Sequence, residues 1–251
     1  MERCSIFIYN EAMVNFKIKL ANTVFEINAF NETTKKYCID FLCDEEPRYV
    51  ITMTKEDLEN EIHISNDGKV YVNEEISALY RRIADTFINQ GVIVAHGSSF
   101  KVNNCGFIIT ARSGVGKSTH ARLLKQYLGD ELTYINDDKP LLEIKDDDVI
   151  IHSSPWNGKE RRGNDIPSSL KAIIFLNRGI DNTYRKIDNK EGIYFRLMSQ
   201  IYLPRDKDKR EKALKIIDIL LKRLNFYEIN VNMDISAPQM TYERIIKNET
   251  K

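Results

Sequence analysis

The chain has 251 residues, enough to bury a large core in one big domain or two smaller ones. Its 37 lysine and arginine residues balance 37 aspartate and glutamate residues, so we expect no general attraction to nucleic acid or to an anionic membrane. No apolar run approaches the roughly 18–20 residues of a transmembrane helix, and no signal peptide is recognisable. The four cysteines show neither zinc-ligand spacing nor a disulfide framework. These features predict a cytoplasmic protein.

Residues 1–90 are predicted to form an N-terminal α+β unit. Asp67-Gly68 between two alternating segments predicts a hairpin turn, and apolar residues at helical spacing predict a helix over Glu75–Asn89 that stops at Gly91. The unit carries no motif for chemistry, so we expect it to help bind an acceptor. Short apolar stretches predict strands at Ser5–Tyr9, Phe16–Leu20, Thr23–Ile27, Tyr49–Met53, Glu61–Ile64 and Lys69–Val72.

Residues 91–251 are predicted to form a second domain. Strands grouped as hairpins, with helices placed late, favour an α/β (α+β) fold with a mixed sheet over regular parallel alternation. Lys101–Cys105 is interpreted as a turn. The predicted strands are Val92–Ala95, Phe107–Ile109, Thr133–Ile135, Leu141–Ile144, Val149–His152, Leu170–Leu176 and Tyr227–Met233. The predicted helices are Thr119–Tyr127, Glu191–Tyr202, Lys207–Leu224 and Pro238–Lys247.

The strongest motif, at residues 107–119, reads Phe-Ile-Ile-Thr-Ala-Arg-Ser-Gly-Val-Gly-Lys-Ser-Thr. A strand, a glycine-rich loop and a helix in this order predict a P-loop, whose backbone N–H groups and helix N-terminus face a polyphosphate. Lys117 would reach the outer phosphates, and the Ser118 hydroxyl would bind Mg²⁺. Ala111 replaces the first glycine of the usual pattern. The predicted nucleotide-binding residues are Ser113, Gly114, Val115, Gly116, Lys117, Ser118 and Thr119.

Two adjacent aspartates, Asp137 and Asp138, follow a predicted strand downstream of this loop. An acidic group there can hold Mg²⁺ or accept a proton from an attacking hydroxyl. Because neighbours in an extended chain point opposite ways, we expect the two carboxylates to have different partners. A solvated turn is the alternative. His96 ends an earlier strand and could contact phosphate or assist proton transfer, with a hydrogen-bonded structural role as the alternative.

A third cluster, beginning at Ser154, reads Ser-Pro-Trp-Asn-Gly-Lys-Glu-Arg-Arg. Lys159 and one of the two arginines, Arg161 foremost, are candidates to neutralise charge on a transferred phosphoryl group. Trp156 could stack on a base or anchor the loop. Arg112 is expected to face solvent.

Together, His96-Gly97, the segment Gly106–Lys117 and Asp137-Asp138 resemble the catalytic domain of HPr kinase/phosphorylase, a family grouped with phosphoenolpyruvate carboxykinase. The resemblance covers roughly residues 92–176, and it implies a mixed-sheet P-loop kinase core and assembly into a homo-oligomer. It also implies an active-site role for His96, an acid/base role for Asp137 toward a serine hydroxyl, and a link to the metal for Asp138. The Glu-Ile-Arg-Gly type of signature found in HPr kinases is missing from this chain.

The sequence thus predicts an enzyme that uses ATP, or another nucleoside triphosphate, and Mg²⁺ to phosphorylate a hydroxyl. The acceptor, a serine of a protein or peptide or a small molecule, is not specified by any motif. Ala111 leaves open a nucleotide-gated binding module with little catalysis. A carboxykinase-like enzyme is a third alternative, which the short chain and the lack of additional histidine and lysine metal ligands disfavour.

Overall fold

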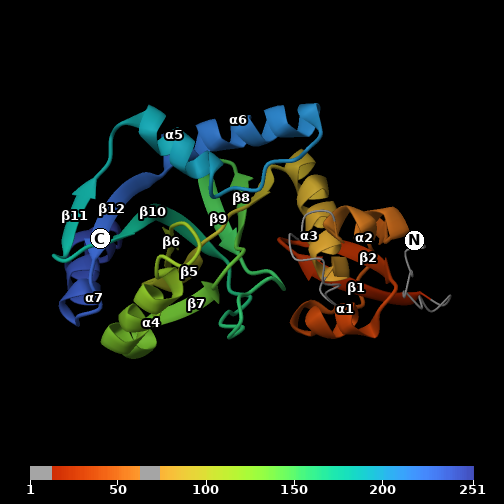
Figure 1. Cartoon of the computed structure of the whole chain (residues 1–251), viewed down its shortest axis with the longest axis horizontal. Coiled ribbons are helices and arrows are strands. Elements are labelled where there is room, and N and C mark those ends of the chain that lie inside the picture. The colour runs from red at the N-terminus through yellow and green to blue at the C-terminus, as the bar shows by residue number, and fades with distance from the viewer. Residues whose placement is uncertain (1–12, 63–73) are drawn as a thin grey trace, which may run out of the picture. The chain divides into compact units, whose positions relative to one another are not determined.

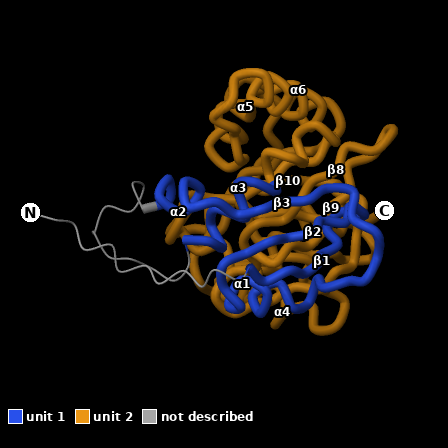
Figure 2. The backbone as a smooth tube through the Cα atoms, turned by 90° about the vertical axis from the view of Figure 1, so that its right-hand side faces the viewer, with its two compact units in different colours: residues 1–83 blue, residues 84–251 orange. Residues whose placement is uncertain are grey.

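The structure is a computed structural model that describes residues 13–62 and 74–251 (Figure 1). It divides into two compact units, Met1–Ile83 and Ala84–Lys251 (Figure 2). The boundary falls inside helix α3 (Glu74–Phe87), earlier than the expected end of the first domain at residue 90. The predicted strands Ser5–Tyr9 and Lys69–Val72 and the predicted hairpin turn at Asp67-Gly68 lie outside the described residues.

The first unit contains a three-stranded sheet, and its three predicted strands are confirmed. β1 (Val14–Leu20) and β2 (Thr23–Ala29) form an antiparallel hairpin, and β3 (Tyr49–Thr52) pairs with β2 in parallel. Residues 21 and 22 both have positive φ, as a tight hairpin turn requires. The predicted helix is confirmed as α3. The sequence missed two short polar helices, α1 (Glu32–Tyr37) and α2 (Lys55–Ile62). The predicted strand Glu61–Ile64 is wrong where it is described, because Glu61 and Ile62 are the last two residues of α2.

The second unit is built on a nine-stranded sheet, ordered β4-β8-β9-β10-β6-β5-β7, with β12 beside β10 and β11 beside β12. β6, β10 and β12 are mutually parallel, whereas the other pairs are antiparallel, which confirms the predicted mixed sheet. The strands are β4 (Val92–Val94), β5 (Ser98–Val102), β6 (Cys105–Thr110), β7 (Leu132–Asn136), β8 (Leu141–Lys145), β9 (Asp148–His152), β10 (Ser168–Arg178), β11 (Thr183–Lys186) and β12 (Asn225–Val231).

Helices cover both faces of this sheet (Figure 1). Alternate side chains of the central strand β10 enter two different cores, as the two-residue period of a strand requires. Ile173 and Phe175 pack with α5 (Lys190–Met198) and α6 (Lys207–Arg223), whereas Ile174 and Leu176 pack with α4 (Lys117–Leu128) and α7 (Ser236–Thr241). Burial on both faces explains why β10 is nearly continuous in apolar residues. The remaining helical segments are Ile39–Phe41, Ile88–Gln90, Gly129–Glu131, Tyr242–Ile246 and Lys247–Glu249.

Three local expectations differ from the structure. The expected turn at Lys101–Cys105 is narrower, because β5 runs to Val102 and β6 starts at Cys105. The expected helix Glu191–Tyr202 ends at Met198, and the chain then bridges Ala95 through Ile201. Neither β5 nor β11 was expected as a strand. The side chains of β11 are all exposed, so no apolar pattern marks it.

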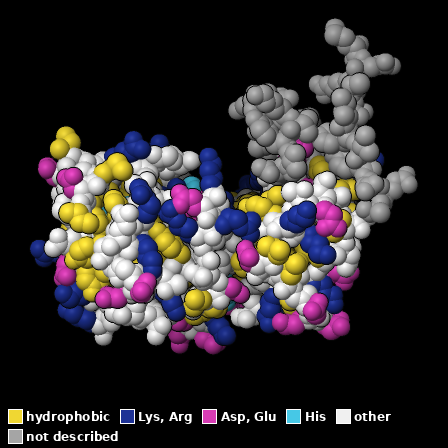
Figure 3. Space-filling view, turned by 90° about the horizontal axis from the view of Figure 1, so that it is seen from below, with side chains coloured by type: hydrophobic (Ala, Val, Ile, Leu, Met, Phe, Trp, Pro, Cys, Tyr) yellow, Lys and Arg dark blue, Asp and Glu magenta, His cyan; other side chains and the backbone are white. Residues whose placement is uncertain are grey.

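The surface carries charges of both signs, interspersed over the face drawn in Figure 3, in keeping with the balanced composition. Within residues 13–62 and 74–251, no helix is long and apolar enough to cross a membrane.

Candidate functional site

A glycine-rich loop, residues 111–116, connects β6 to α4 and is called the glycine loop below. Gly114 and Gly116 have φ values of 78° and 123°. A Cβ at either position would meet nothing within 4 Å, so backbone conformation rather than space demands glycine there. No side chain caps the N-terminus of α4. The loop therefore delivers the positive end of a twelve-residue helix to the carboxyl edge of the sheet.

Lys117, the first residue of α4, turns back onto the glycine loop. Its Nζ donates to the carbonyl of Ala111 at 3.1 Å, and only 8% of the residue is exposed. Burial lowers the pKa of this lysine, while the nearby charges of Asp138 and Asp137 act in the opposite direction. The structure thus brings the lysine and both aspartates into one electrostatic environment.

Arg178, the last residue of β10, holds the glycine loop from the neighbouring strand. Its Nε donates to the carbonyl of Val115 at 3.0 Å, and its Nη2 donates to the carbonyl of Gly114 at 2.8 Å. No motif in the sequence marks this residue. The available signal was its position directly after a buried strand, where side chains of parallel strands gather at one edge.

Asp137 is buried just beyond the end of β7, with 7% of the residue exposed. Its Oδ1 accepts from the Ser98 hydroxyl at 2.6 Å, and its N–H donates to Asn157 Oδ1 at 2.6 Å. Burial raises the pKa of this carboxyl, although hydrogen bonds from the hydroxyls of Ser98 and Ser118 oppose the shift. Asp137 therefore lies beside Ser118, the serine of the first turn of α4 that the motif assigns to the metal.

Asn136, directly before the acidic pair, fixes the turn that carries it. Its Oδ1 accepts from the N–H groups of Asp138 and Lys139 at 2.9 and 2.7 Å. Its Nδ2 donates to the carbonyl of Ser154 at 3.0 Å and to the Ser154 hydroxyl at 3.2 Å. This side chain is fully buried. The sequence signal was an asparagine before two aspartates, a combination that favours side-chain-stabilised turns.

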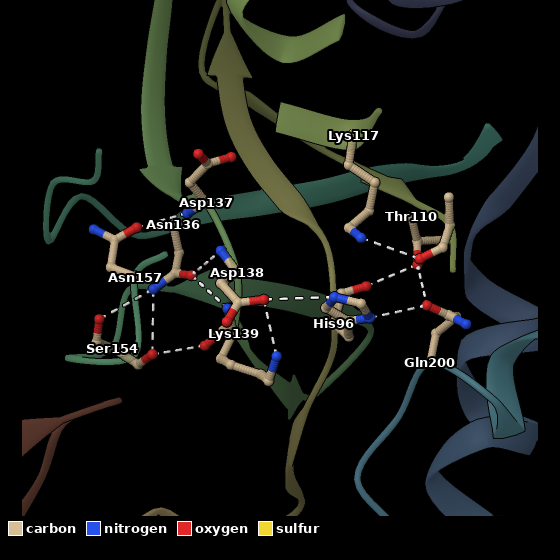
Figure 4. A network of polar contacts seen from close by, with 11 residues as sticks. His96, Thr110, Lys117, Asn136, Asp137, Asp138, Lys139, Ser154, Asn157 and Gln200 are labelled. Atoms are coloured by element: carbon tan, nitrogen blue, oxygen red, sulfur yellow. Dashed lines mark hydrogen bonds and ion pairs between the residues drawn. The ribbon is translucent and has the colours of Figure 1, made fainter. Parts of the chain in front are cut away.

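Asp138 points away from Asp137 and toward His96 (Figure 4). Its Oδ1 accepts from Lys139 Nζ at 2.9 Å and lies 3.5 Å from His96 Nε2. His96 Nδ1 lies 3.1 Å from Gln200 Oε1, and because an amide oxygen only accepts, we assign the ring proton to Nδ1. Burial, aided by the charges of Lys139 and Lys117, lowers the pKa of His96 to about 4, so the ring is neutral at pH 7. Its Nε2 lone pair and the carboxylate can together accept hydrogen bonds from a bound donor.

Two residues missed by sequence reasoning hold His96 in place. The Thr110 hydroxyl donates to the His96 carbonyl at 2.7 Å, and the His96 N–H donates to the Gln200 carbonyl at 2.7 Å. Gly97 follows, and a Cβ there would lie 2.6 Å from Ile108 Cγ2, so only glycine fits. Gln200 follows α5 and is far from His96 in the sequence, so no local pattern could reveal the contact.

The Trp156 loop, residues 154–162, packs behind the acidic pair. Trp156 is 8% exposed and its carbonyl accepts from the Lys139 N–H at 3.1 Å, which fits the loop-anchor interpretation. Lys159 and Arg161 are exposed. Arg162 is the cation of this loop that lowers the pKa of Asp137, and it also lies over the Tyr134 ring at 5.9 Å. Arg112, in the glycine loop, is exposed as expected.

Ser118, Asp137 and Asp138 carry the oxygen ligands that Mg²⁺ prefers, and this ion is usually bound by one or two carboxylates and by substrate phosphates. Ser118 bonds to Asp137, whereas Asp138 points toward His96, so the three oxygens do not converge on one point. Among residues 13–62 and 74–251, no group of three or more His, Cys, Asp or Glu side chains could hold a metal by itself. The protein groups therefore fit a cation shared with a phosphate ligand better than a closed metal cage.

Comparison with known proteins gives only a distant likeness. No protein-family model matches the chain, and no curated protein matches it in sequence. The structure is similar to the HPr(Ser) kinase/phosphatase from Coxiella burnetii, with a TM-score of 0.36 and 12% sequence identity, over 62% of this chain and 88% of that one. At these values the likeness concerns the fold alone.

Proposed function

We propose that this protein is an ATP-dependent phosphotransferase that phosphorylates a hydroxyl group. The observation that supports it most is the glycine loop with the uncapped N-terminus of α4, which brings Lys117 close to an acidic pair. A helix N-terminus and a lysine suit a polyphosphate, and the carboxylates suit a metal and a proton. The motifs that resemble HPr kinase/phosphorylase make a serine hydroxyl the first acceptor to test.

The nucleotide phosphates would be bound by the backbone of Ser113–Thr119 and by the ammonium group of Lys117. Lys117 would then exchange its hydrogen bond to the Ala111 carbonyl for bonds to phosphate oxygens. Ser118 and Asp138 would hold Mg²⁺, which neutralises charge on the phosphates when it is bound.

In the transfer step the acceptor oxygen forms a bond to the terminal phosphorus, and the bond from that phosphorus to the bridging oxygen breaks. Asp137 takes the proton of the acceptor hydroxyl, and the nucleoside diphosphate leaves. His96 contributes a neutral acceptor, Nε2, that can bind a donor group of the acceptor molecule other than the reacting hydroxyl. We assign charge stabilisation to Lys159 and Arg161, which are exposed beside Arg162, the cation of the same loop that acts on Asp137. Positioning and electrostatics supply most of the rate in such reactions.

Nucleotide binding tests the first part of this proposal. The fluorescent analogue mant-ATP, titrated into the whole chain with Mg²⁺, should bind, and Lys117→Ala should weaken binding by about tenfold or more, because a buried cation that contacts phosphate is lost. Lys222→Ala, an exposed lysine on α6, is the control and should bind normally. Equal affinity of the two variants would contradict the role of Lys117.

The two aspartates can be separated with radiolabelled ATP over a Mg²⁺ titration, measuring slow hydrolysis and transfer to serine-containing peptides. Asp137→Asn should abolish transfer without changing the Mg²⁺ requirement, whereas Asp138→Asn should raise that requirement. If Asp137→Asn raised the Mg²⁺ requirement and Asp138→Asn abolished transfer, Asp137 would be the metal ligand and Asp138 the base. The hydrogen bond between Ser118 and Asp137 makes that exchange of roles structurally possible. Tight binding with no turnover on any acceptor would favour the nucleotide-gated module.

A further inference from the structure

A cavity of about 380 Å³ lies beside the glycine loop, between α4 and the carboxyl ends of β10 and β12. This is the size range of small-molecule sites. The cavity begins where the phosphate-binding loop ends, because Val115 and Gly116 belong to both. The apolar and small side chains that line it include Val115, Thr119, Leu123, Leu176, Val231 and Met233.

The far wall of the cavity is a built structure. Two loops that follow β10 and β12 are joined by a reciprocal pair of hydrogen bonds. Asn182 Nδ2 donates to Asn232 Oδ1 at 2.9 Å, and the Asn232 N–H donates to Asn182 Oδ1 at 2.9 Å. Asn232 Nδ2 also donates to the carbonyl of Ile180 at 3.0 Å. These bonds hold the wall in position before any ligand arrives.

The chemistry of the walls favours an uncharged group. Arg178 is the only charged group among the described lining residues, and its guanidinium is bonded to the glycine loop. His120 also lines the cavity. The Thr241 hydroxyl donates its own proton to the Ala237 carbonyl. Toward His120 Nε2, 3.0 Å away, it therefore acts as the acceptor, so Nε2 carries the ring proton and donates it. The Nδ1 of this ring is buried and has no partner among the described residues, so His120 presents ring carbons rather than a polar atom to the cavity.

The rim of the cavity exposes large apolar side chains. Ile180 is 91% exposed and Met233 is 71% exposed. Both adjoin the cavity, through Gly179 for Ile180 and as a lining residue for Met233. A ligand seated here would remove apolar surface from water.

We propose that this cavity binds the nucleoside of the triphosphate whose phosphates the glycine loop holds, which rests on the proposed function. Continuity with the loop and largely apolar walls fit a base and its ribose. A second cavity of about 510 Å³ lies on the other side of the end of β10. Its walls include Arg112, Arg196 and Gln200, and Gln200 bonds to His96. The charged and amide side chains of that cavity suit a polar acceptor better than a base.

The test compares two ligands of the whole chain, mant-ATP and inorganic tripolyphosphate, which has the phosphates but no nucleoside. Leu123→Trp fills the cavity, and Leu123 is not part of either core of the second unit. Gln126→Trp places the same side chain at an exposed position of the same helix and is the matched control. Met233→Asp changes an exposed rim residue and puts the fold at little risk.

Leu123→Trp and Met233→Asp should each weaken mant-ATP binding by about tenfold or more and leave tripolyphosphate binding within about twofold, whereas Gln126→Trp should match the wild type. Wild-type affinity of both cavity variants for mant-ATP would overturn the inference. If Leu123→Trp lost binding of both mant-ATP and tripolyphosphate, the result for Met233→Asp would decide whether the cavity binds the nucleoside. Normal mant-ATP binding by Met233→Asp would then overturn the inference. A wild-type chain that bound neither ligand would instead contradict the proposed function itself.

Discussion

The buried histidine of α4 makes the stability of the second unit depend on pH in a predictable way. His120 is 2% exposed, and burial lowers its pKa from 6.5 to about 4. In the unfolded chain the same ring takes up a proton near pH 6.5. Between these two pKa values, acid therefore favours the unfolded state.

The sign and size follow from proton linkage. The folded pKa is lowered, so stability is fully present above pH 6.5 and is lost as the pH falls toward about 4, below which the loss is complete. The full loss from this one ring is about 3 kcal/mol, and about 2 kcal/mol of it falls between pH 7 and pH 5. His120→Leu should remove this loss and cost about 1 kcal/mol at pH 7, because the hydrogen bond to Thr241 disappears.

Urea unfolding between pH 7 and pH 4.5, followed by fluorescence, measures the effect. Trp156 is the only tryptophan of the chain and lies in the second unit, so it reports the unit that contains His120. Thr241→Val is the control, because it breaks the same hydrogen bond but keeps the ring that titrates. The stability difference between wild type and His120→Leu should shrink and then reverse as the pH falls.

A constant difference between wild type and His120→Leu across this pH range would refute the reasoning. Thr241→Val should keep the wild-type slope of stability against pH. If it lost the slope as His120→Leu does, the hydrogen bond rather than ring protonation would be the cause.

Two further changes test the residues that position the site. Asn136→Ala removes four hydrogen bonds of a buried amide and should destabilise the second unit by about 2–4 kcal/mol in urea unfolding; a loss below about 1 kcal/mol would show that the turn does not need this side chain. Arg178→Gln removes the two bonds that hold the glycine loop and should weaken mant-ATP binding by about five- to tenfold with little change in stability, because Arg178 is exposed. Arg178→Lys should recover part of the affinity, and wild-type affinity of Arg178→Gln would show that the loop keeps its shape unaided.

Sequence patterns predicted the elements whose signal is local. The buried strand Leu170–Leu176 and the hairpin of Leu141–Ile144 with Val149–His152 are present as β10, β8 and β9. Elements without an apolar pattern were missed, because exposed strands and short polar helices owe their structure to neighbours rather than to their own sequence. The end of α5 was misplaced for a related reason, since the chain after Met198 is held by pairing with Ala95.

Part of the candidate site could likewise be predicted from local sequence patterns, and part could not. The strand, glycine loop and helix follow from the sequence because a phosphate-binding turn needs glycine and a helix start within a few consecutive residues, and Asp137-Asp138 follows a strand end visible in the same pattern. The contacts of Arg178 and Gln200 came only from the tertiary structure. Their partners lie 64 and 104 residues away. The order of β6 and β10 in the sheet brings Arg178 to the glycine loop, and the bridge between Ala95 and Ile201 brings Gln200 to His96. The cavity beside the loop was also invisible in the sequence, because its walls come from α4, β10 and β12 and exist only once these elements have packed.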